Sequence, residues 1–265
     1  MSILSAEHLD LGYRRGLLVV RDLALDVAGG EIVTLVGPNG SGKSTILRAL
    51  GRLLRPQGGA VYLNGEAIHR LSTRHVARQL AILPQNPTAP EDLTVRDLVV
   101  RGRYVRQAWW RASSAHDRGV IDWALASTGL HDLSDRRLNA LSGGERQRAW
   151  IALALAQEPR ILLLDEPTTF LDISHQLDVM ALLQRLNAEN GLSIVMVLHD
   201  LNQAARFSHR LIALHHGAVY ASGTPGEVLT EEMMREVFQV EGVVGRDSHT
   251  GTPTFTPIQS VRPSP

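Results

Sequence analysis

A glycine-rich segment between a short apolar run and a predicted helix constrains this chain more than any other feature. Residues Gly37 to Ser44 read Gly-Pro-Asn-Gly-Ser-Gly-Lys-Ser, which is the pattern GxxxxGK[ST] of a phosphate-binding loop. The β-branched run Ile32 to Val36 precedes it, and a helix is predicted from Lys43 to Leu54. In this strand–loop–helix setting, backbone N–H groups point inward and the helix presents its positive end, so the segment predicts an anion site.

Lys43 is the only lysine among the 27 basic residues, and all the others are arginine. A compact ammonium on a thin stem reaches phosphates through a ring of backbone amides, whereas a wider guanidinium cannot replace it there. Ser44 is expected to offer its hydroxyl to Mg²⁺, and Thr45 to hydrogen-bond a nearby phosphate. The residues predicted to bind nucleotide here are Gly37, Pro38, Asn39, Gly40, Ser41, Gly42, Lys43, Ser44 and Thr45.

Composition narrows the class of protein. A chain of 265 residues with 44% hydrophobic content is long enough for one large domain or a domain with an inserted lobe. The net charge of +0 gives no indication of bulk nucleic-acid binding. There is no cysteine, which is compatible with a reducing compartment, and Met1 to Asp10 does not resemble a signal peptide. The apolar runs are too short to span a bilayer, so any membrane role is expected to come through a partner.

The pattern along the chain predicts strands alternating with helices, interrupted from about Pro87 to Gln157 by an inserted helical lobe. Such alternation favours a mostly parallel sheet covered on both faces. Ser72 is expected to cap a helix that runs through Gln79, and the tail from Glu241 is expected to be loose or edge structure. The predicted strands are Ile3–Leu11, Leu17–Val27, Ala60–Leu63, Leu80–Leu83, Ile161–Leu164, Ser193–Leu198 and Leu211–Leu214, and the further helices are Thr94–Gly102, Ala115–Thr128, Ile173–Glu189 and Leu201–Phe207.

Two carboxylates end the apolar strand Ile161 to Leu164. Asp165 and Glu166 would lie at the carboxyl end of a parallel strand, where such sheets bind ligands. Asp165 is expected to hold Mg²⁺, through water, and Glu166 to polarise an attacking water. The alternative is a solvated turn after a buried strand, which the nearby phosphate loop disfavours.

A second small-residue helix start lies at Leu141 to Gln147, which reads Leu-Ser-Gly-Gly-Glu-Arg-Gln. Ser142, Gly143 and Gly144 offer a hydroxyl and bare N–H groups to an anion, although an ordinary helix cap has the same appearance. One nucleotide does not need two such sites from one chain. The redundancy therefore suggests that two chains share each nucleotide.

Together these motifs resemble the ATP-binding subunits of ABC transporters, at least over residues 3 to 240. Gly37 to Thr45 matches the family's Walker A motif, and Ile161 to Glu166 its Walker B motif. Leu141 to Gln147 matches the signature motif, with Glu145 where Gln is commonest. That difference is expected to be tolerated, because Ser142, Gly143 and Gly144 make the phosphate contacts.

Further residues are assigned by the resemblance alone. Gln85 matches the glutamine that senses Mg²⁺ and the γ-phosphate, and His199 matches the switch histidine that contacts the γ-phosphate. Thr169 to Asp172 lies at the D-loop and departs from the commoner Ser-Ala-Leu-Asp, with Asp172 retained as a binding residue. Tyr13 is placed as the aromatic that stacks on adenine. The resemblance thus implies catalytic roles for Glu166, His199 and Gln85, and a Mg²⁺ site at Ser44, Gln85 and Asp165.

The resemblance also implies a P-loop NTPase core of α/β class, with an N-terminal antiparallel β subdomain and an inserted α-helical subdomain. The expected division is 1–86 and 158–240 for the two parts of the core, 87–157 for the helical subdomain and 241–265 for a tail. ATP and Mg²⁺ are the implied cofactors. The implied partners are permease subunits, a second copy in a head-to-tail dimer and, indirectly, an extracytoplasmic substrate-binding protein. No nucleic acid is expected, and the implied location is the cytoplasmic face of the cell membrane.

Within the family, Asp165 to Gln176 and Val197 to Ala204 resemble the ATPases of iron–siderophore importers. ATPases of haem, cobalamin and other metal-chelate importers are the alternatives, since residues that touch cargo lie outside this chain. A phosphoryl-transfer kinase would have no use for the signature segment. A non-transport ABC ATPase usually carries insertions or a second nucleotide-binding half that this chain lacks.

Two other pairs are interpreted as structural. His215 and His216, followed by Gly217, are expected to form a solvated turn rather than a metal site. Trp109 and Trp110, in the predicted helical lobe, are expected to make packing or partner contacts.

Overall fold

The computed structural model describes residues 2–90, 92–106 and 114–261. Trp109 and Trp110 lie outside these described residues. The chain divides into two compact units, a first unit of Met1–Arg70 with Ser193–Pro265 and a second unit of Leu71–Leu192. These boundaries differ from the four-part division expected from the sequence, which stays a prediction.

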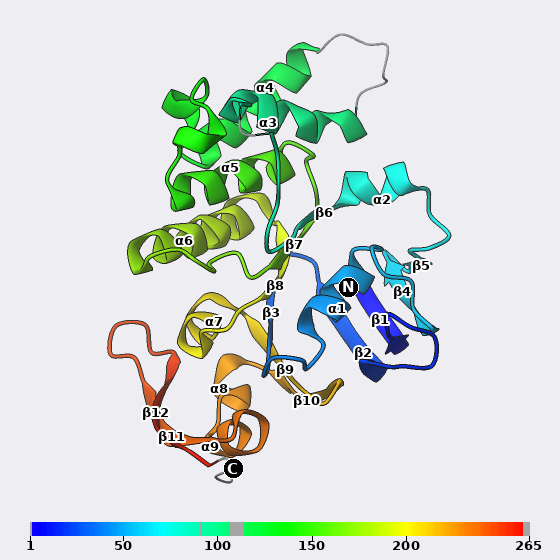
Figure 1. The fold of residues 1–265 in the computed structure, drawn as a ribbon, viewed down its shortest axis with the longest axis vertical. Helices are drawn as coiled ribbons and strands as arrows, with labels where there is room; N and C mark the ends of the chain where they lie inside the picture. The colour runs from blue at the N-terminus through cyan, green and yellow to red at the C-terminus, as the bar shows by residue number, and fades with distance from the viewer. Residues whose placement is uncertain (1, 91, 107–113, 262–265) are drawn as a thin grey trace. The chain divides into compact units, whose positions relative to one another are not determined.

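The first unit holds an antiparallel sheet and a mostly parallel one (Figure 1). Strands of the antiparallel sheet, in spatial order, are β2 (Val20–Ala28), β1 (Ser2–Leu11), β4 (Gly58–Leu63) and β5 (Glu66–Ala67). In the other sheet, β3 (Ile32–Val36) pairs in parallel with β8 (Ser193–Val197) and β9 (Arg210–His215), and β10 (Ala218–Gly223) adds antiparallel to β9. All five residues of β3 and of β8 are buried, as expected for parallel strands covered on both faces.

Helices of the first unit are short. They are α1 (Lys43–Leu50), α7 (Leu201–Phe207), α8 (Pro225–Val228), α9 (Glu231–Met233) and the π-helical turn η4 (Met234–Phe238). Helix α1 ends four residues before the predicted Leu54, because the chain turns at Gly51 and then at Arg52, whose φ is 60°. Strand β2 likewise begins at Val20 rather than Leu17.

The tail was expected to be loose or edge structure, and the first of these alternatives is wrong. Strands β11 (Val240–Arg246) and β12 (Pro253–Ser260) form an antiparallel hairpin, and β12 packs on α7 (Figure 1). The side-chain amide of Asn202 bonds both backbone groups of Phe255: its Oδ1 accepts from the N–H at 2.8 Å and its Nδ2 donates to the carbonyl at 3.3 Å. The Phe255 ring is buried. Polar and glycine-rich composition hid this contact, which joins residues far apart in the chain.

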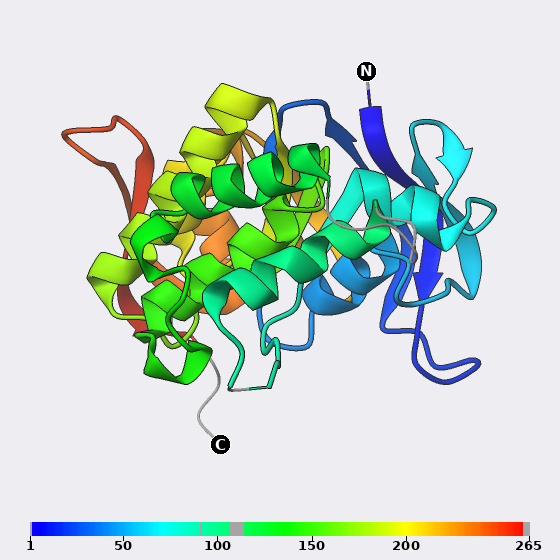
Figure 2. The ribbon, with the colours of Figure 1, turned by 90° about the horizontal axis from the view of Figure 1, so that it is seen from above.

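The second unit consists of a parallel strand pair, β6 (Leu80–Leu83) and β7 (Ile161–Asp165), and a set of helices. Its helices are α2 (Thr73–Gln79), α3 (Val95–Arg101), η1 (Gly102–Val105), α4 (Ala115–Ser127), η2 (His131–Leu133), η3 (Leu138–Ala140), α5 (Gly143–Leu155) and α6 (Ile173–Asn190). Figure 2 shows α3, α4 and α5, which all fall within the predicted helical lobe, lying against one another.

Local capping explains where several of these helices begin. Ser72 accepts a hydrogen bond from the His75 N–H, as predicted for α2. Helices α3, α4 and α5 each begin with a capping box, in which a Ser or Thr and an acid three residues later bond each other's backbone N–H. Each box satisfies two donors that a helix start would otherwise leave unpaired.

An ion network joins three segments of the second unit. The Arg103 side chain is 2% exposed and donates to Asp117 at 2.8 Å, to Glu158 at 2.7 Å and to the Ala156 carbonyl at 2.7 Å. A buried guanidinium needs such pairing, so Arg103 ties η1, α4 and the α5–β7 loop together.

Candidate active site

The phosphate loop leaves β3 with a backbone that glycine alone accepts. Gly37, Gly40 and Gly42 have φ values of 152°, 82° and 102°. A Cβ added at Gly37 would lie 2.4 Å from the Leu214 carbonyl oxygen and 2.8 Å from Ser41 Oγ. The glycines of the motif therefore allow both the left-handed turns and the close approach to β9.

Lys43 points back into this loop. It is 6% exposed, and its Nζ donates to the Gly37 carbonyl at 2.7 Å and the Pro38 carbonyl at 2.9 Å. The ammonium is thus held inside the ring of backbone groups, where a planar guanidinium would meet the loop walls.

The loop suits an anionic ligand on two counts. Helix α1 begins at an N-cap, Gly42, that makes no side-chain cap, and its first turn carries no acidic residue. Ser41 Oγ is buried and has no hydrogen-bond partner among the described residues. A phosphate would supply the acceptor that this hydroxyl lacks, and the helix start favours negative charge.

Tyr13 lies beside the loop. Its hydroxyl shares a hydrogen bond with Thr45 Oγ1 at 3.2 Å and accepts one from Arg48 at 3.4 Å, while 58% of the residue is exposed. The structure thus brings the predicted adenine contact to the start of α1, and its stacking role stays a prediction.

His199 follows β8 at the same sheet edge as the loop. Leu35 pairs with Val197 in the parallel register, so the chain leaves β3 and β8 in the same direction. Asp200 then caps α7 by accepting from the N–H groups of Asn202 and Gln203. The switch position predicted for His199 is therefore on a short connection between a buried strand and a capped helix.

In the second unit, Gln85 and Glu166 are in direct contact. Leu83 pairs with Leu164, so β6 and β7 also end at one edge. Gln85 Nε2 donates to Glu166 Oε2 at 2.5 Å, and Thr169 Oγ1 donates to the same oxygen at 3.0 Å. Glu166 has a φ of 54°, unusual for a residue with a Cβ. Asp165, the last residue of β7, is 6% exposed, so the two adjacent carboxylates have different surroundings.

The signature segment begins α5. Ser142 is the N-cap, with its Oγ accepting from the Glu145 N–H at 3.2 Å and its own N–H donating to Glu145 Oε2 at 2.8 Å. The backbone hydrogen bond from Ser142 is the main cause that lowers the pKa of Glu145. Gly144 packs against His175. A Cβ added at Gly144 would lie 2.0 Å from the ring atom Cδ2 of His175, so this glycine is needed for helix packing.

Asp172 caps α6. One carboxylate oxygen accepts from the His175 N–H at 2.9 Å, from the Ser174 hydroxyl at 2.9 Å and from the His175 ring at 2.7 Å. These hydrogen bonds, led by the one from the His175 backbone, lower the pKa of Asp172 to about 2. Any contact of Asp172 with nucleotide or a partner stays a prediction.

Thr169 and His175 were not singled out by sequence reasoning. Thr169 lies three residues after Glu166, a spacing that closes a turn, but only the left-handed backbone at Glu166 turns the hydroxyl onto its carboxylate. The turn between β9 and β10 is formed by His216 and Gly217, whereas His215 is the last residue of β9, so the predicted turn begins one residue later.

The predicted residues therefore fall into two sets, one in each unit. The first unit holds Tyr13, Gly37 to Thr45 and His199, and the second holds Gln85, Ser142, Gly143, Gly144, Asp165, Glu166 and Asp172. Within the second unit, the structure joins Gln85 to Glu166 by a hydrogen bond that the sequence did not predict.

The fold and these motifs define a P-loop ATP-binding cassette. The family model described as ABC transporter matches residues 20–169, and the chain belongs to this family. The iron(3+)-hydroxamate import ATP-binding protein FhuC of Bacillus subtilis is 51% identical over 96% of this chain and 94% of the relative.

Two solved structures are also similar. An inward-facing conformation of a putative metal-chelate type ABC transporter contains a chain with a TM-score of 0.84 and 28% identity, covering 98% of each chain. The dimeric bacterial ABC transporter cassette MJ0796 has a TM-score of 0.73 and 30% identity over 84% of this chain and 98% of the other. In the described part of this chain, no helix combines the length and apolarity needed to cross a membrane.

Proposed function

We propose that this chain is the ATP-hydrolysing subunit that powers import of a ferric siderophore through a membrane permease. The contact between Gln85 and Glu166 supports the hydrolytic part, because it joins a strand-end carboxylate to a polar sensor. The cargo part rests on the segment Thr169 to Gln176 and on the 51% identity to an iron(3+)-hydroxamate import protein.

ATP would bind with its phosphates in the loop Gly37 to Thr45. The Lys43 ammonium would move from the Gly37 and Pro38 carbonyls to the β- and γ-phosphates, and Ser41 Oγ would gain the acceptor that it lacks. Tyr13, half-exposed beside Thr45, would cover the adenine. His199 would contact the γ-phosphate.

The residues assigned to Mg²⁺ suit that ion, because hydroxyl, carboxylate and amide oxygens are the hard donors that it prefers. Ser44, Asp165 and Gln85 would hold it, and it would neutralise phosphate charge when bound. Gln85 uses its amide nitrogen toward Glu166, which leaves its amide oxygen as the donor for a cation.

Glu166 would polarise the attacking water as general base. Thr169 and Gln85 both bond Oε2 of this carboxylate and fix its direction. The Gln85 contact would transmit the state of the γ-phosphate to the helical lobe that follows, and so to a docked permease.

Ser142, Gly143 and Gly144 would bind the nucleotide held by a second copy in a head-to-tail dimer, and Asp172 would order the neighbouring segment. The cassette MJ0796, similar to this chain, is dimeric in its solved structure. A location at the cytoplasmic face of the membrane, an extracytoplasmic substrate-binding protein and the absence of a nucleic-acid partner complete the proposal. The zero net charge agrees with the last point.

Gene deletion combined with uptake assays tests the cargo separately from the ATPase. Loss of the gene should lower uptake of radiolabelled ferric siderophore and slow growth only under iron limitation. Unchanged uptake of hydroxamate, catecholate and citrate chelates, with a defect for haem or cobalamin, would overturn the cargo and leave the ATPase standing. Absence of ATP hydrolysis by the purified chain with its permease would overturn the enzyme assignment itself.

A further inference from the structure

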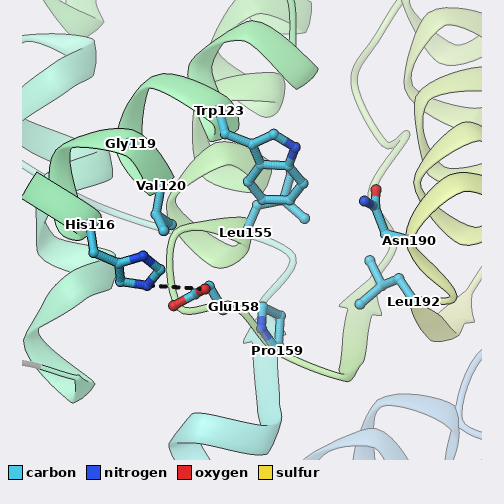
Figure 3. Close-up of a pocket in the computed structure, with 9 residues that line it drawn as sticks. All are labelled: His116, Gly119, Val120, Trp123, Leu155, Glu158, Pro159, Asn190 and Leu192. Atoms are coloured by element: carbon cyan, nitrogen blue, oxygen red, sulfur yellow. Dashed lines mark ion pairs between the residues drawn. The ribbon is translucent and has the colours of Figure 1, made fainter.

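A cavity of about 420 Å³ lies in the second unit, between α4, the α5–β7 loop and the end of α6 (Figure 3). Its walls are mainly apolar: Val120, Leu155 and Leu192 are 8%, 2% and 4% exposed. The Trp123 indole is 39% exposed. None of the residues assigned to nucleotide or to hydrolysis lines this cavity.

The polar end of the cavity is the carboxylate of Glu158. Its Oε2 accepts a hydrogen bond from Arg103 at 2.7 Å. Its Oε1 lies 3.5 Å from His116 Nε2, the one basic nitrogen within 4 Å of this oxygen among the described residues. Burial opposes ionisation of Glu158, but the hydrogen bond from Arg103 and the charges of Arg103, Arg106 and His116 together outweigh it and lower the pKa. The carboxylate facing the cavity is therefore negative at neutral pH, with one oxygen weakly paired.

Two guanidinium groups lie near Glu158, but neither of them lines the cavity. Arg103 is shared between Asp117, Glu158 and the Ala156 carbonyl. Arg106 donates to the carbonyls of Arg78, Gln157 and Glu158, and its Nε lies 3.9 Å from Glu158 Oε2. Among the described residues that line the cavity, Glu158 is the one acid and His116 the one base, so the ionised carboxylate favours a cation at Oε1.

Gly119 leaves the α4 side of the cavity open. A helix with glycine in its interior is less stable than the same helix with alanine. At Gly119, neither a left-handed φ nor a close contact requires glycine. A Cβ added at Gly119 would have no atom within 4 Å. The missing side chain keeps space in the cavity instead of serving the packing of α4.

We propose that this cavity binds a small organic cation with an apolar body and a primary ammonium group. The ammonium would pair with Glu158 Oε1 and lie against the Trp123 indole, and the body would cover Val120, Leu155 and Leu192. A carboxylate together with an exposed indole is a combination that recognises ammonium ions. This assignment does not depend on the proposed transport function.

Three probes that share a phenyl body test the charge preference. Phenethylammonium, 2-phenylethanol and 3-phenylpropionate are titrated against the purified chain by saturation-transfer NMR. The cation should bind about tenfold or more tighter than the alcohol and the carboxylate, a difference of about 1.4 kcal/mol. Glu158→Gln, which keeps an acceptor for Arg103, should reduce the advantage of the cation to about twofold or less. Equal binding of all three probes, or preference for the carboxylate, would overturn the proposal.

Substitution of Gly119 tests the location without removing any interaction. Gly119→Leu should fill the cavity and weaken phenethylammonium binding about tenfold or more. The matched variant Gly119→Ala should bind within about threefold of the parent and unfold at a higher temperature, because alanine favours the helix. Unchanged binding in Gly119→Leu would place the cation elsewhere and refute the assignment, even if Glu158→Gln failed to fold.

Discussion

Two glycine-rich segments of this protein begin a helix, and they satisfy the helix start in opposite ways. At the phosphate loop, α1 starts from Gly42 with no side-chain cap and no acid in its first turn. At the signature segment, α5 starts from Ser142 with a complete capping box, and Glu145 holds the Ser142 N–H. The first start is open to an anion, whereas the second already carries a negative charge of its own.

The difference separates ligand binding from helix stability. An uncapped helix start is less stable alone but offers its N–H groups to phosphate. A capping box stabilises the helix by about 1 kcal/mol, yet here it puts a carboxylate where the proposed partner's nucleotide would arrive. Five experiments test this contrast, from the largest expected effect to the smallest.

Lys43→Arg should lower the rate of ATP hydrolysis by more than about a hundredfold. It should also severely weaken nucleotide binding, although the positive charge is kept. The reason is the enclosed position of Nζ between the Gly37 and Pro38 carbonyls. Steady-state ATPase assays and nucleotide titrations measure both effects. Arg48→Lys, the reverse change in the same helix, serves as the control, and near parental activity in Lys43→Arg would refute the argument.

Glu166→Gln should bind ATP but hydrolyse it at least about a hundredfold more slowly than the parent, because the water loses its base while Asp165 is unchanged. Gln keeps an acceptor for Thr169 and Gln85, so the local structure should persist. Size-exclusion chromatography with ATP should then show a dimer. A monomer at high protein concentration would contradict the proposal that the phosphate loop of one chain and the signature segment of another share one nucleotide.

Ser142→Arg should leave ATP binding to the isolated chain largely intact but block hydrolysis, because we propose that the signature segment binds the partner's nucleotide. Mixing it with Lys43→Ala chains should restore about one competent site per mixed dimer. Loss of the cap should also cost about 1 kcal/mol of stability.

The control for lost capping is Ser114→Ala, which opens the equivalent box of α4 away from these residues. It should reduce stability similarly without affecting hydrolysis. If Ser142→Arg weakened nucleotide binding to the isolated chain, the signature segment would act within its own chain instead.

Glu145→Gln should tighten the ATP-dependent dimer by about two- to fivefold when combined with Glu166→Gln, because a charge facing phosphate is removed while the bond to Ser142 is kept. The gain should shrink at high salt, which screens exposed charges. Sedimentation at two ionic strengths measures it, with Asp97→Asn in the α3 box as the control. No change at low salt would mean that Glu145 does not face the nucleotide.

Asp172 supplies a third kind of helix start, with the smallest expected effect. Its pKa of about 2 lies below the ordinary value of 3.8, so its contribution to stability is present above pH 3.8 and lost as the pH falls to about 2. The difference in unfolding temperature between the parent and Asp172→Asn should therefore shrink through this window. A constant difference would show that the charge of Asp172 is not what stabilises α6.

Features of short range were predictable from the residues. The loop glycines, the Ser72 cap and the Ser-Gly-Gly start of α5 depend on hydrogen bonds and dihedral angles within a few positions. The helices and strands predicted from periodicity are present, with ends displaced by a few residues, whereas β10, α8 and α9 were not predicted. The ordered hairpin of the tail was not predicted, because Phe255 is bonded by Asn202, which lies in another element.

The sequence by itself determined the phosphate loop, the strand-end carboxylates and the family resemblance, because each is written in neighbouring residues with a fixed chemical use. Only the tertiary structure decided which distant groups meet. Gln85 reaches Glu166 because β6 and β7 pair in register, and the cavity beside Glu158 exists because α4, the α5–β7 loop and the end of α6 lie together. Such contacts join residues that are tens of positions apart in the sequence. They depend on how the strands and helices pack, which a local sequence pattern does not encode.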